Sequence, residues 1–466
     1  MAKKEEKSKN ELLQKKIFLD KKSSWNDLNQ KEVFAFTDKY KQFMAESKTE
    51  RLCIENVISD LKKGGFKEIT TVKKVSSGDK IFKNIKGKAV FAAIVGKDMK
   101  RWQLIGSHVD SPRLDLKPSP VYEDSGLGLI KTHYYGGVKK YHWVNTPLAL
   151  HGVVFTKEGK KIIINIGDKI NEPKFIIPDL LPHLARTQME RKAGKIVEGE
   201  ELNILVGNIP VNDKKIKEQV KFTVLKYLYE KYGLIEEDFF TAELELVPAV
   251  MPMDIGFDSA LIAAYGQDDK VCVYTSLRAL LETKAPKHTA VGMFVDKEEI
   301  GSVGDTGAAG MILENFAYDY ICLTGLKITV SQLLESSDAI SADVTAGMDP
   351  NHKDVHDAQN ASYLGKGVSV EKYGGGGGKY STNDASAEYM SYLRLLLDKN
   401  KIAWQTGELG KIDLGGGGTI AMYISQYGMN CVDVGPCLLG MHSPCEVISK
   451  ADVYSAYLFY KAFFKD

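Results

Sequence analysis

The feature that most constrains the fold of this chain is a set of acidic and histidine clusters that lie far apart in the sequence: His108-Val109-Asp110, Asp268-Asp269, Glu298-Glu299, Asp343 and His442. Imidazole and carboxylate side chains are the groups that hold divalent ions in hydrolytic sites. The clusters supply two imidazoles and three carboxylates as ligands for two ions, and further carboxylates for supporting roles. The chain must therefore fold so that these distant segments meet.

A two-ion site assigns a role to each cluster. Each ion receives one imidazole and one carboxylate, and a third carboxylate bridges the pair: His108 with Asp343, Glu299 with His442, and Asp268 between them. Asp110 lies two residues after His108, so on a strand both side chains point the same way and the carboxylate can orient the imidazole. Glu298 and Glu299 are adjacent, and both can face the ions only if the backbone turns there. The glycines of the segment 301–304 permit such a turn.

Largely apolar segments precede three of the clusters and predict where these clusters lie. The segments are 102–107 before His108, 291–295 before Glu298-Glu299, and 320–323 in the region before Asp343. Apolar strands that end in ionisable residues place them at the carboxyl edge of a mostly parallel sheet, where α/β proteins build their sites. Taken singly, each acidic pair also fits a helix N-terminus or a solvated turn.

Length and ligand spacing predict two domains. At 466 residues the chain exceeds the size at which single cores stop growing. The long segment between His108 and Asp268 contributes no obvious ligand, which is typical of a separate unit. We therefore expect one domain of residues 1–115 and 250–466, interrupted by an inserted domain of residues 116–249.

Hydrophobic periodicity and turn signals predict individual elements. They are helical spacing over 25–65, strands at 148–155 and 161–166, and helices at 218–232, 268–281 and 384–397. Gly233 ends the helix at 218–232, and Asn383 or Asp384 can cap the last helix. Outside the inserted segment, strands and helices alternate as a doubly wound α/β core requires.

Composition excludes several classes of function. The net charge of +1 argues against a nucleic-acid-binding surface, which needs an excess of Lys and Arg. No apolar run reaches the roughly 18 residues of a membrane helix. Residues 1–7 are charged and lack the apolar core of a signal peptide, so we expect a cytoplasmic protein. In that compartment the six cysteines are expected to be reduced.

Five ordered motifs resemble those of the aspartyl aminopeptidase family of binuclear zinc peptidases. They are Gly106-Ser107-His108-Val109-Asp110-Ser111-Pro112-Arg113, Asp268-Asp269-Lys270, Asp296-Lys297-Glu298-Glu299-Ile300-Gly301-Ser302, Ile340-Ser341-Ala342-Asp343 and Gly440-Met441-His442-Ser443-Pro444. The resemblance implies an α/β fold: a phosphorylase/hydrolase-like, three-layer catalytic domain with a mixed sheet, plus an inserted β-rich assembly domain. It also implies a large homo-oligomer, for example a dodecamer.

The resemblance implies an exopeptidase that removes the N-terminal residue of peptides through a water bridging two metal ions. The implied metal ligands are His108, Asp268, Glu299, Asp343 and His442. Glu298 would be the general base, and Asp110 would hold His108. Zinc is the implied metal, and the same ligands admit manganese or cobalt.

The implied substrate pocket departs from the family pattern. Family members selective for N-terminal Asp or Glu carry histidines shortly after the ligand aspartate, where this chain has Ala346 and Asp349, and a carboxylate there would repel an acidic side chain. We therefore expect an altered or broad first-residue preference, and the acidic preference that the resemblance implies is the alternative. Lys372 and Lys379 are candidates to meet a substrate carboxylate. His183 matches a family histidine that reaches a neighbouring subunit's site.

Two other functions share these sequence features. A metal-dependent deacylase or other amidohydrolase would keep every ligand but accept N-acyl substrates. A non-enzymatic assembly protein could retain the fold alone, although the intact Glu298 and ligand set argue against it.

Overall fold

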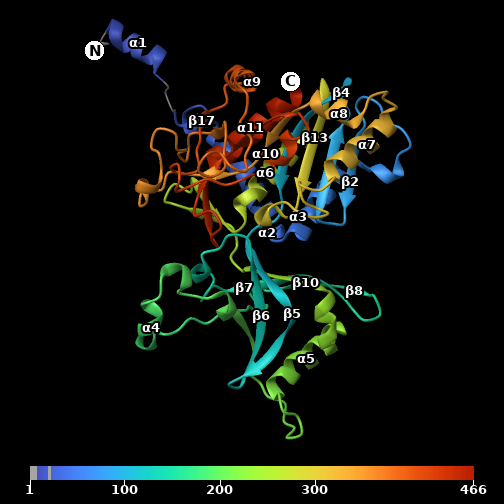
Figure 1. The fold of residues 1–466 in the computed structure, drawn as a ribbon, viewed down its shortest axis with the longest axis vertical. Coiled ribbons are helices and arrows are strands. Elements are labelled where there is room, and N and C mark those ends of the chain that lie inside the picture. Colours follow the sequence, from blue (N-terminus) through green and yellow to red (C-terminus); the bar gives the residue numbers. More distant parts are fainter. Residues whose placement is uncertain (1–7, 19–21) are drawn as a thin grey trace.

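The structure, a computed structural model, describes residues 8–18 and 22–466, so the charged segment 1–7 lies outside the described residues. Within the described residues the chain forms a mixed α/β fold with three sheets. Figure 1 shows two bodies: an upper one with the N- and C-terminal parts of the chain, and a lower one around β5, β6, β7 and β10.

A nine-stranded mixed sheet forms the centre of the upper body. Its order is β1 (Lys67–Glu68), β2 (Lys80–Ile85), β3 (Ala89–Ile94), β13 (His288–Val295), β4 (Asp98–His108), β14 (Asp338–Ser341), β18 (Asn430–Gly435), β16 (Val368–Glu371) and β17 (Trp404–Thr406). The four central strands β13, β4, β14 and β18 are parallel, and Val295 pairs with His108 where β13 and β4 end. Their carboxyl ends therefore share one edge, as the apolar runs predicted.

The predicted strand at 320–323 is wrong. These residues belong to helix α7 (Ile312–Thr324), and the strand that leads to Asp343 is β14. Phe316, Ala317 and Tyr320 are buried on one face of α7. An apolar run of four residues cannot by itself distinguish such a helical face from a strand.

Helices pack on both faces of the nine-stranded sheet. Successive residues of a strand point to opposite faces, so they pack in two separate hydrophobic cores. Ile105 packs in a core with α2 (Gln30–Glu46), α3 (Glu50–Lys63), α6 (Gln267–Glu282), α9 (Ala387–Lys399) and α11 (Lys450–Lys465). Leu104 packs in a second core with α7, α8 (Val330–Glu335) and α10 (Ala421–Ser425). The assignment to a phosphorylase/hydrolase-like class stays a prediction.

A six-stranded sheet forms the lower body and has its own core. Its order is β8 (Lys161–Ile166), β7 (Leu148–Phe155), β10 (Ala242–Pro248), β5 (Arg113–Asp124), β6 (Leu127–Tyr135) and β9 (Asn203–Gly207). Helix α5 (Gln219–Tyr232) packs beside it (Figure 1), and the chain also forms the short helix α4 (Arg186–Met189). The strands predicted at 148–155 and 161–166 are confirmed, whereas the proposed domain boundaries stay a prediction.

A five-stranded sheet carries one of the predicted ligand loops. Its order is β11 (Met253–Ile255), β12 (Leu261–Ala264), β20 (Glu446–Ser449), β19 (Cys437–Leu439) and β15 (Thr345–Ala346). Strands β19 and β20 are antiparallel neighbours. The loop between them contains His442, so the hairpin fixes where this loop begins and ends.

Most predicted helices are confirmed, with one corrected start. Helix α5 ends at Gly233, which adopts a left-handed conformation with φ 73°. Helix α9 begins at Ala387, later than predicted, because the Asp384 carboxylate pairs with Lys379 (2.8 Å) and does not cap the helix. Ser386 caps it instead and accepts the Tyr389 N–H.

The short helix α1 (Lys9–Ile17) lies at the N-terminal end of the described chain. Among the helices of the described residues, none combines the length and apolar character needed to span a membrane. All six cysteines are free thiols, four of them buried.

Candidate metal centre

The predicted ligands meet in one cavity at the carboxyl edge of the nine-stranded sheet. They come from five places: His108 at the end of β4, Asp268 in the first turn of α6, Glu298 and Glu299 just after β13, Asp343 just after β14, and His442 between β19 and β20. All six side chains line a cavity of about 510 Å³. The fold thus brings together segments that the sequence keeps far apart.

Asp268 lies between the two histidines. Its Oδ1 is 3.1 Å from His108 Nε2, and its Oδ2 is 3.2 Å from His442 Nε2. Glu299 Oε2 is 3.4 Å from the same His442 nitrogen, and Asp343 Oδ1 is 4.0 Å from His108 Nε2. Each histidine therefore faces one oxygen of Asp268, and a further carboxylate lies beside each histidine.

Asp269 is an additional candidate that the sequence did not single out as a ligand. Its carboxylate is fully buried and forms, with the imidazole of His108 and the carboxylate of Asp343, a group whose ligand atoms are all within 4.8 Å of one another. His108, Asp268 and Glu299 form a second such group. Because Asp269 also accepts the backbone N–H of His108 at 3.3 Å, it supports the end of β4.

Asp110 connects the ligand histidine to the glutamate pair. His108 Nδ1 lies 3.3 Å from Asp110 Oδ1 and 3.1 Å from the Asp110 carbonyl oxygen. The same carboxylate accepts the backbone N–H of Glu298 (3.1 Å) and of Glu299 (3.2 Å). Asp110 is fully buried. One carboxylate therefore fixes both an imidazole and the backbone of the neighbouring turn.

The glutamate pair lies in the backbone turn that the sequence required. Glu298–Ile300 form a short 3-10 helix, flanked by Lys297 with φ 68° and Gly301 with φ 94°. Gly301 was expected to permit the turn, whereas the left-handed Lys297 carries no sequence signal of its own. The turn lets both carboxylates face the same cavity.

The His442 loop is held by two groups outside the ligand set. His442 has φ 64° and donates its backbone N–H to Glu446 Oε1 at 2.8 Å. The other oxygen, Glu446 Oε2, accepts the backbone N–H of Asp268 at 3.1 Å. His442 Nδ1 lies 2.9 Å from the carbonyl oxygen of Gly137, which can accept its proton. The Nε2 atom is then left to face Asp268 and Glu299.

The electrostatics of the cavity favour cations. Burial, with repulsion from Asp268, raises the pKa of Glu299, and burial with repulsion from Asp269 raises the pKa of Asp343. Burial likewise raises the pKa of Glu298 to about 7, although the nearby His108 opposes this shift. These acids repel one another when all are ionised, and a bound divalent cation relieves that repulsion.

The residues fit a zinc centre on the chemistry of their donor atoms. Two imidazole nitrogens and several carboxylate oxygens converge, which is the donor set of hydrolytic zinc sites. Glu299 Oε1 and Asp269 Oδ1 are buried without a hydrogen-bond partner, and such orphaned oxygens suit metal coordination. Lys270 is fully buried nearby and donates to Ser111 Oγ at 2.6 Å, so a fixed cation also stabilises this acidic region.

The wall of the cavity beyond the ligands is glycine-rich and apolar, with one further carboxylate. It includes Gly374 and residues 416–418, together with the side chains Val344, Leu409, Met422, Tyr423 and Met441. Glu371 supplies that carboxylate; it is 8% exposed, and burial raises its pKa to about 7. Within the described residues, no Lys or Arg side chain lines this cavity.

The four predicted substrate-contacting residues lie outside the cavity. His183 is exposed in a short turn of the lower body, and Lys372 is exposed after β16. Asp349 accepts the backbone N–H of Asn351 at 2.8 Å. Lys379 pairs with an aspartate and lies 3.9 Å from the ring centre of Tyr373, beside the cavity. Their roles toward substrate stay predictions.

Sequence reasoning missed three residues that support the site. Glu446 and Asp269 hold backbone N–H groups of the ligand segments, and Glu371 lines the cavity. Asp269 and Glu446 lie one and four residues from predicted ligands, which is their one sequence signal. Glu371 is the last residue of the buried strand β16. An ionisable residue at the end of a buried strand is the signal that located His108, and it could also have located Glu371.

Known proteins share this fold and sequence. A family model described as aminopeptidase I zinc metalloprotease (M18) matches residues 43–464. The probable M18 family aminopeptidase 1 of Clostridium acetobutylicum is 45% identical over 453 residues, covering 95% of this chain and 97% of that protein. The crystal structure of the M18 family aminopeptidase of Thermotoga maritima has a TM-score of 0.94 at 44% identity, covering 96% of this chain and 100% of that chain.

A more distant structure shares the fold alone. The mApe1 dodecamer of S. cerevisiae is 22% identical, with a TM-score of 0.74, and the match covers 92% of this chain and 96% of that chain. The mixed α/β architecture with several sheets is thus the architecture of known M18 aminopeptidases.

Proposed function

The chain belongs to the aminopeptidase I zinc metalloprotease (M18) family and is a metalloaminopeptidase, a hydrolase, and on this premise we propose how its residues act. The observation that carries the proposal is the position of Asp268, whose two oxygens face imidazoles from two different segments. A carboxylate presented in this way suits two cations at once. The proposed ligands of two zinc ions, for which manganese or cobalt could substitute, are His108, Asp268, Glu299, Asp343 and His442.

Glu298 is the proposed general base. Two bound zinc ions would supply a water of lowered pKa and polarise the scissile carbonyl. Glu298 Oε2 lies 3.9 Å from His108 Nε2, beside the ligands, and its pKa of about 7 suits proton transfer near neutral pH. It would take the proton of the attacking water and deliver it to the leaving amine. Asp110 keeps the base and His108 in fixed relative positions.

The cavity supports a peptide substrate with a free α-amine. The ligand carboxylates, Glu298 and Glu371 give the cavity an excess of acidic groups, which attract a cationic ammonium. The glycines of the wall let the backbone approach a peptide closely. We expect cleavage after the first residue. When the acidic groups hold the α-ammonium of the substrate, only its first peptide bond lies near Glu298.

The wall also supports a first-residue preference that is not acidic. Methionine, leucine and valine side chains line it, and Glu371 would repel a substrate carboxylate. We therefore keep the expectation of an altered or broad first-residue preference, and we propose that neutral first residues are preferred. The repelling group proposed from the structure is Glu371, in place of Asp349.

We propose that residues 116–249 form an inserted domain that mediates assembly into a large homo-oligomer, by analogy with the dodecamer of S. cerevisiae mApe1. In support, this part of the chain exposes many large apolar side chains, among them Ile163, Ile170, Ile209, Tyr229 and Phe240. Contiguous exposed apolar surface marks interaction sites. His183, exposed on the same body, is available to reach a neighbouring subunit.

A cytoplasmic location stays our proposal. Its support in the structure is the state of the cysteines, because all six are free thiols and such usage fits a reducing compartment.

Paired substrates test the proposed reaction against a deacylase. Zinc-loaded protein would be assayed on leucine p-nitroanilide and on its N-acetyl derivative, which differ only in the free amine. We expect hydrolysis of the free amine and at least about tenfold slower hydrolysis of the acetylated compound, since an uncharged amide loses the attraction of the acidic cavity. Faster hydrolysis of the N-acetyl compound would favour the deacylase.

A further inference from the structure

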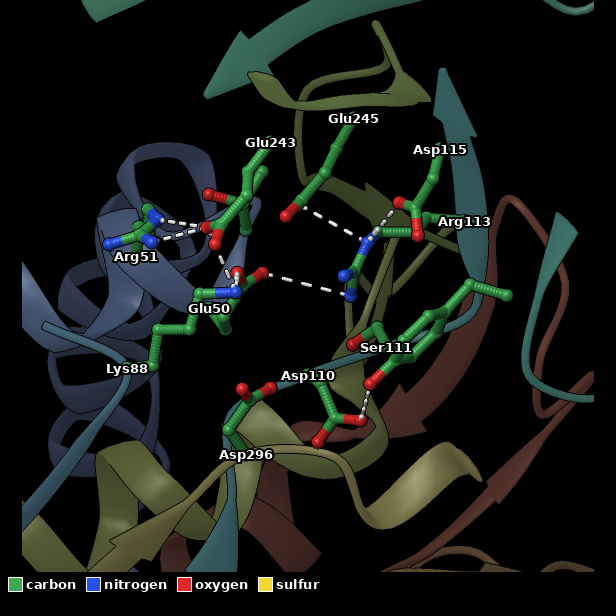
Figure 2. Close-up of polar contacts among 12 residues, drawn as sticks. Glu50, Arg51, Lys88, Asp110, Ser111, Arg113, Asp115, Glu243, Glu245 and Asp296 are labelled. Carbon is green, nitrogen blue, oxygen red and sulfur yellow. Dashed lines mark hydrogen bonds and ion pairs between the residues drawn. The ribbon is translucent and has the colours of Figure 1, made fainter. Parts of the chain in front are cut away.

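The lower body reaches the metal centre through the end of strand β6. Tyr135, the last residue of β6, donates its hydroxyl to Asp110 Oδ2 at 2.9 Å. This is the same Asp110 that contacts His108 and accepts the backbone N–H groups of the glutamate turn. In Figure 2, Asp110 lies below Arg113 and Asp115, which both belong to β5.

Arg113 fixes the ring of Tyr135. The two residues are directly opposite on the antiparallel strands β5 and β6, and the guanidinium carbon lies 3.8 Å from the ring centre. A guanidinium at this distance over an aromatic face is attracted to it and restricts its rotation. Arg113 is 6% exposed, so both the stacking and its charge are largely removed from water.

Three carboxylates, of which those of Glu50 and Glu245 are buried, hold Arg113 in turn. Arg113 Nε lies 2.8 Å from Asp115 and 3.3 Å from Glu245, and its Nη1 lies 3.7 Å from Glu50. Glu50 belongs to α3 of the upper body, whereas Asp115 and Glu245 belong to the lower sheet (Figure 2). Arg113 therefore joins the two bodies directly behind Tyr135. A buried guanidinium with partners on both sides has little freedom to move.

The two residues after Tyr135 touch the other side of the centre. The carbonyl oxygen of Gly137 faces His442 Nδ1 at 2.9 Å. Gly136 has φ 75°, and a Cβ at this position would lie 3.3 Å from Glu299 Oε2. The left-handed backbone of Gly136 therefore favours glycine where the chain passes close to a predicted ligand.

We propose that Tyr135 is a positioning residue of the metal centre. Segment 135–137 would hold both histidine ligands in fixed positions relative to the place where the two bodies pack together. The inference rests on the proposed ligand roles of His108 and His442. Tyr135 acts through Asp110, and Gly137 acts through the Nδ1 atom of His442. Removing the Tyr135 hydroxyl takes one donor from Asp110 and loosens both the imidazole and the glutamate turn. Groups that orient metal ligands typically change metal affinity or activity by about 10–100-fold when lost.

Tyr135→Phe tests the proposal because it removes the hydroxyl and keeps the ring under Arg113. The matched control is Tyr134→Phe, the neighbouring residue on β6, whose side chain is 41% exposed and points to the opposite face. Metal-free proteins would be titrated with Co²⁺, and the visible absorption bands would report the ligand geometry. Thermal unfolding of the metal-free proteins and kcat and KM of the zinc-loaded proteins would be measured alongside.

We expect Tyr135→Phe to bind Co²⁺ about tenfold more weakly, with altered bands, and to lose kcat by a similar factor at unchanged KM. Tyr134→Phe should match the wild type, and metal-free Tyr135→Phe should stay folded at the assay temperature, unfolding only a few degrees below the wild type because one hydrogen bond to a buried carboxylate is lost. Wild-type bands, affinity and kcat in Tyr135→Phe would overturn the positioning role. Unfolding of the metal-free variant at the assay temperature would also overturn it, in favour of a general structural role. A wild type that binds Co²⁺ but hydrolyses no peptide would contradict the proposed function instead.

Discussion

The Nε2 atom of His108 lies 3.1 Å from one carboxylate oxygen of Asp268, in the cavity at the carboxyl edge of the nine-stranded sheet. The second oxygen of Asp268 faces His442, which lies far away in the sequence. Asp268 is 4% exposed and Asp110 is fully buried. The centre is therefore built around one carboxylate that two segments share, and its geometry depends on residues that hold those segments.

Asp268→Asn should remove metal from the centre. An amide offers a single acceptor oxygen and no charge, so it cannot be shared by two cations. We expect zinc content, measured by mass spectrometry after gel filtration, to fall below two ions per chain, and activity to fall by at least about 100-fold. Asp258→Asn, the same change at an exposed aspartate, should keep full metal content. Two tightly held ions in Asp268→Asn would contradict the bridging role.

Glu446→Gln should weaken zinc binding although Glu446 is not a proposed ligand. Glu446 accepts backbone N–H groups of His442 and Asp268 through separate oxygens, and an amide can serve only one of them. The unpaired buried N–H costs about 1–3 kcal/mol. We expect zinc affinity, measured by competition with a chelator, to fall by about 10–100-fold. The exposed Glu388→Gln is the control, and unchanged affinity in Glu446→Gln would count against this role.

Much of the site could be predicted because the residue types carry the chemistry. Imidazoles and carboxylates at the ends of apolar strands indicated a shared sheet edge, and β4 and β13 do end side by side at His108 and Val295. The need for a turn at Glu298-Glu299 followed from strand geometry alone. These inferences depend on local sequence, which is why they succeeded.

The supporting residues could not be predicted in the same way. Glu446 and Tyr135 act by holding groups of distant segments, and these contacts exist only once the chain has folded. The run 320–323 was placed in a strand because four apolar residues fit either element. Helix α9 begins at Ala387 and not at the predicted residue 384, because Asp384 pairs with Lys379. This contact lies within a loop, and no helix signal in the sequence indicates it.

Activity should fall as the pH falls below neutrality. Glu298 must be ionised to accept a proton, and burial raises its pKa to about 7 against the opposing influence of His108. Protonation below this value removes the base, so kcat/KM should increase with pH across the acidic range. Bound cations favour the ionised form, so the midpoint should lie at or below pH 7. A pH profile of zinc-loaded protein in which kcat/KM decreases from pH 5 to 7 would contradict this assignment.

Acidic first residues should be poor substrates. Glu371 lines the cavity, and at pH 8, above its pKa of about 7, it is ionised and repels a substrate carboxylate. We expect kcat/KM for aspartyl and glutamyl p-nitroanilides to be at least about tenfold below that for the leucyl compound. Glu371→Gln should reduce this difference, whereas Asp349→Asn, outside the cavity, should not. A wild type that prefers aspartyl or glutamyl substrates would refute the proposed preference.

The most direct test of the account is Glu298→Gln in protein loaded with zinc, with zinc content measured on the same sample. We expect two ions per chain in both proteins and a decrease in kcat of about 10²–10⁴-fold in the variant, because the ligands remain while the proton acceptor is lost. The exposed Glu388→Gln should retain wild-type kcat. Wild-type turnover by a fully zinc-loaded Glu298→Gln protein would contradict the account.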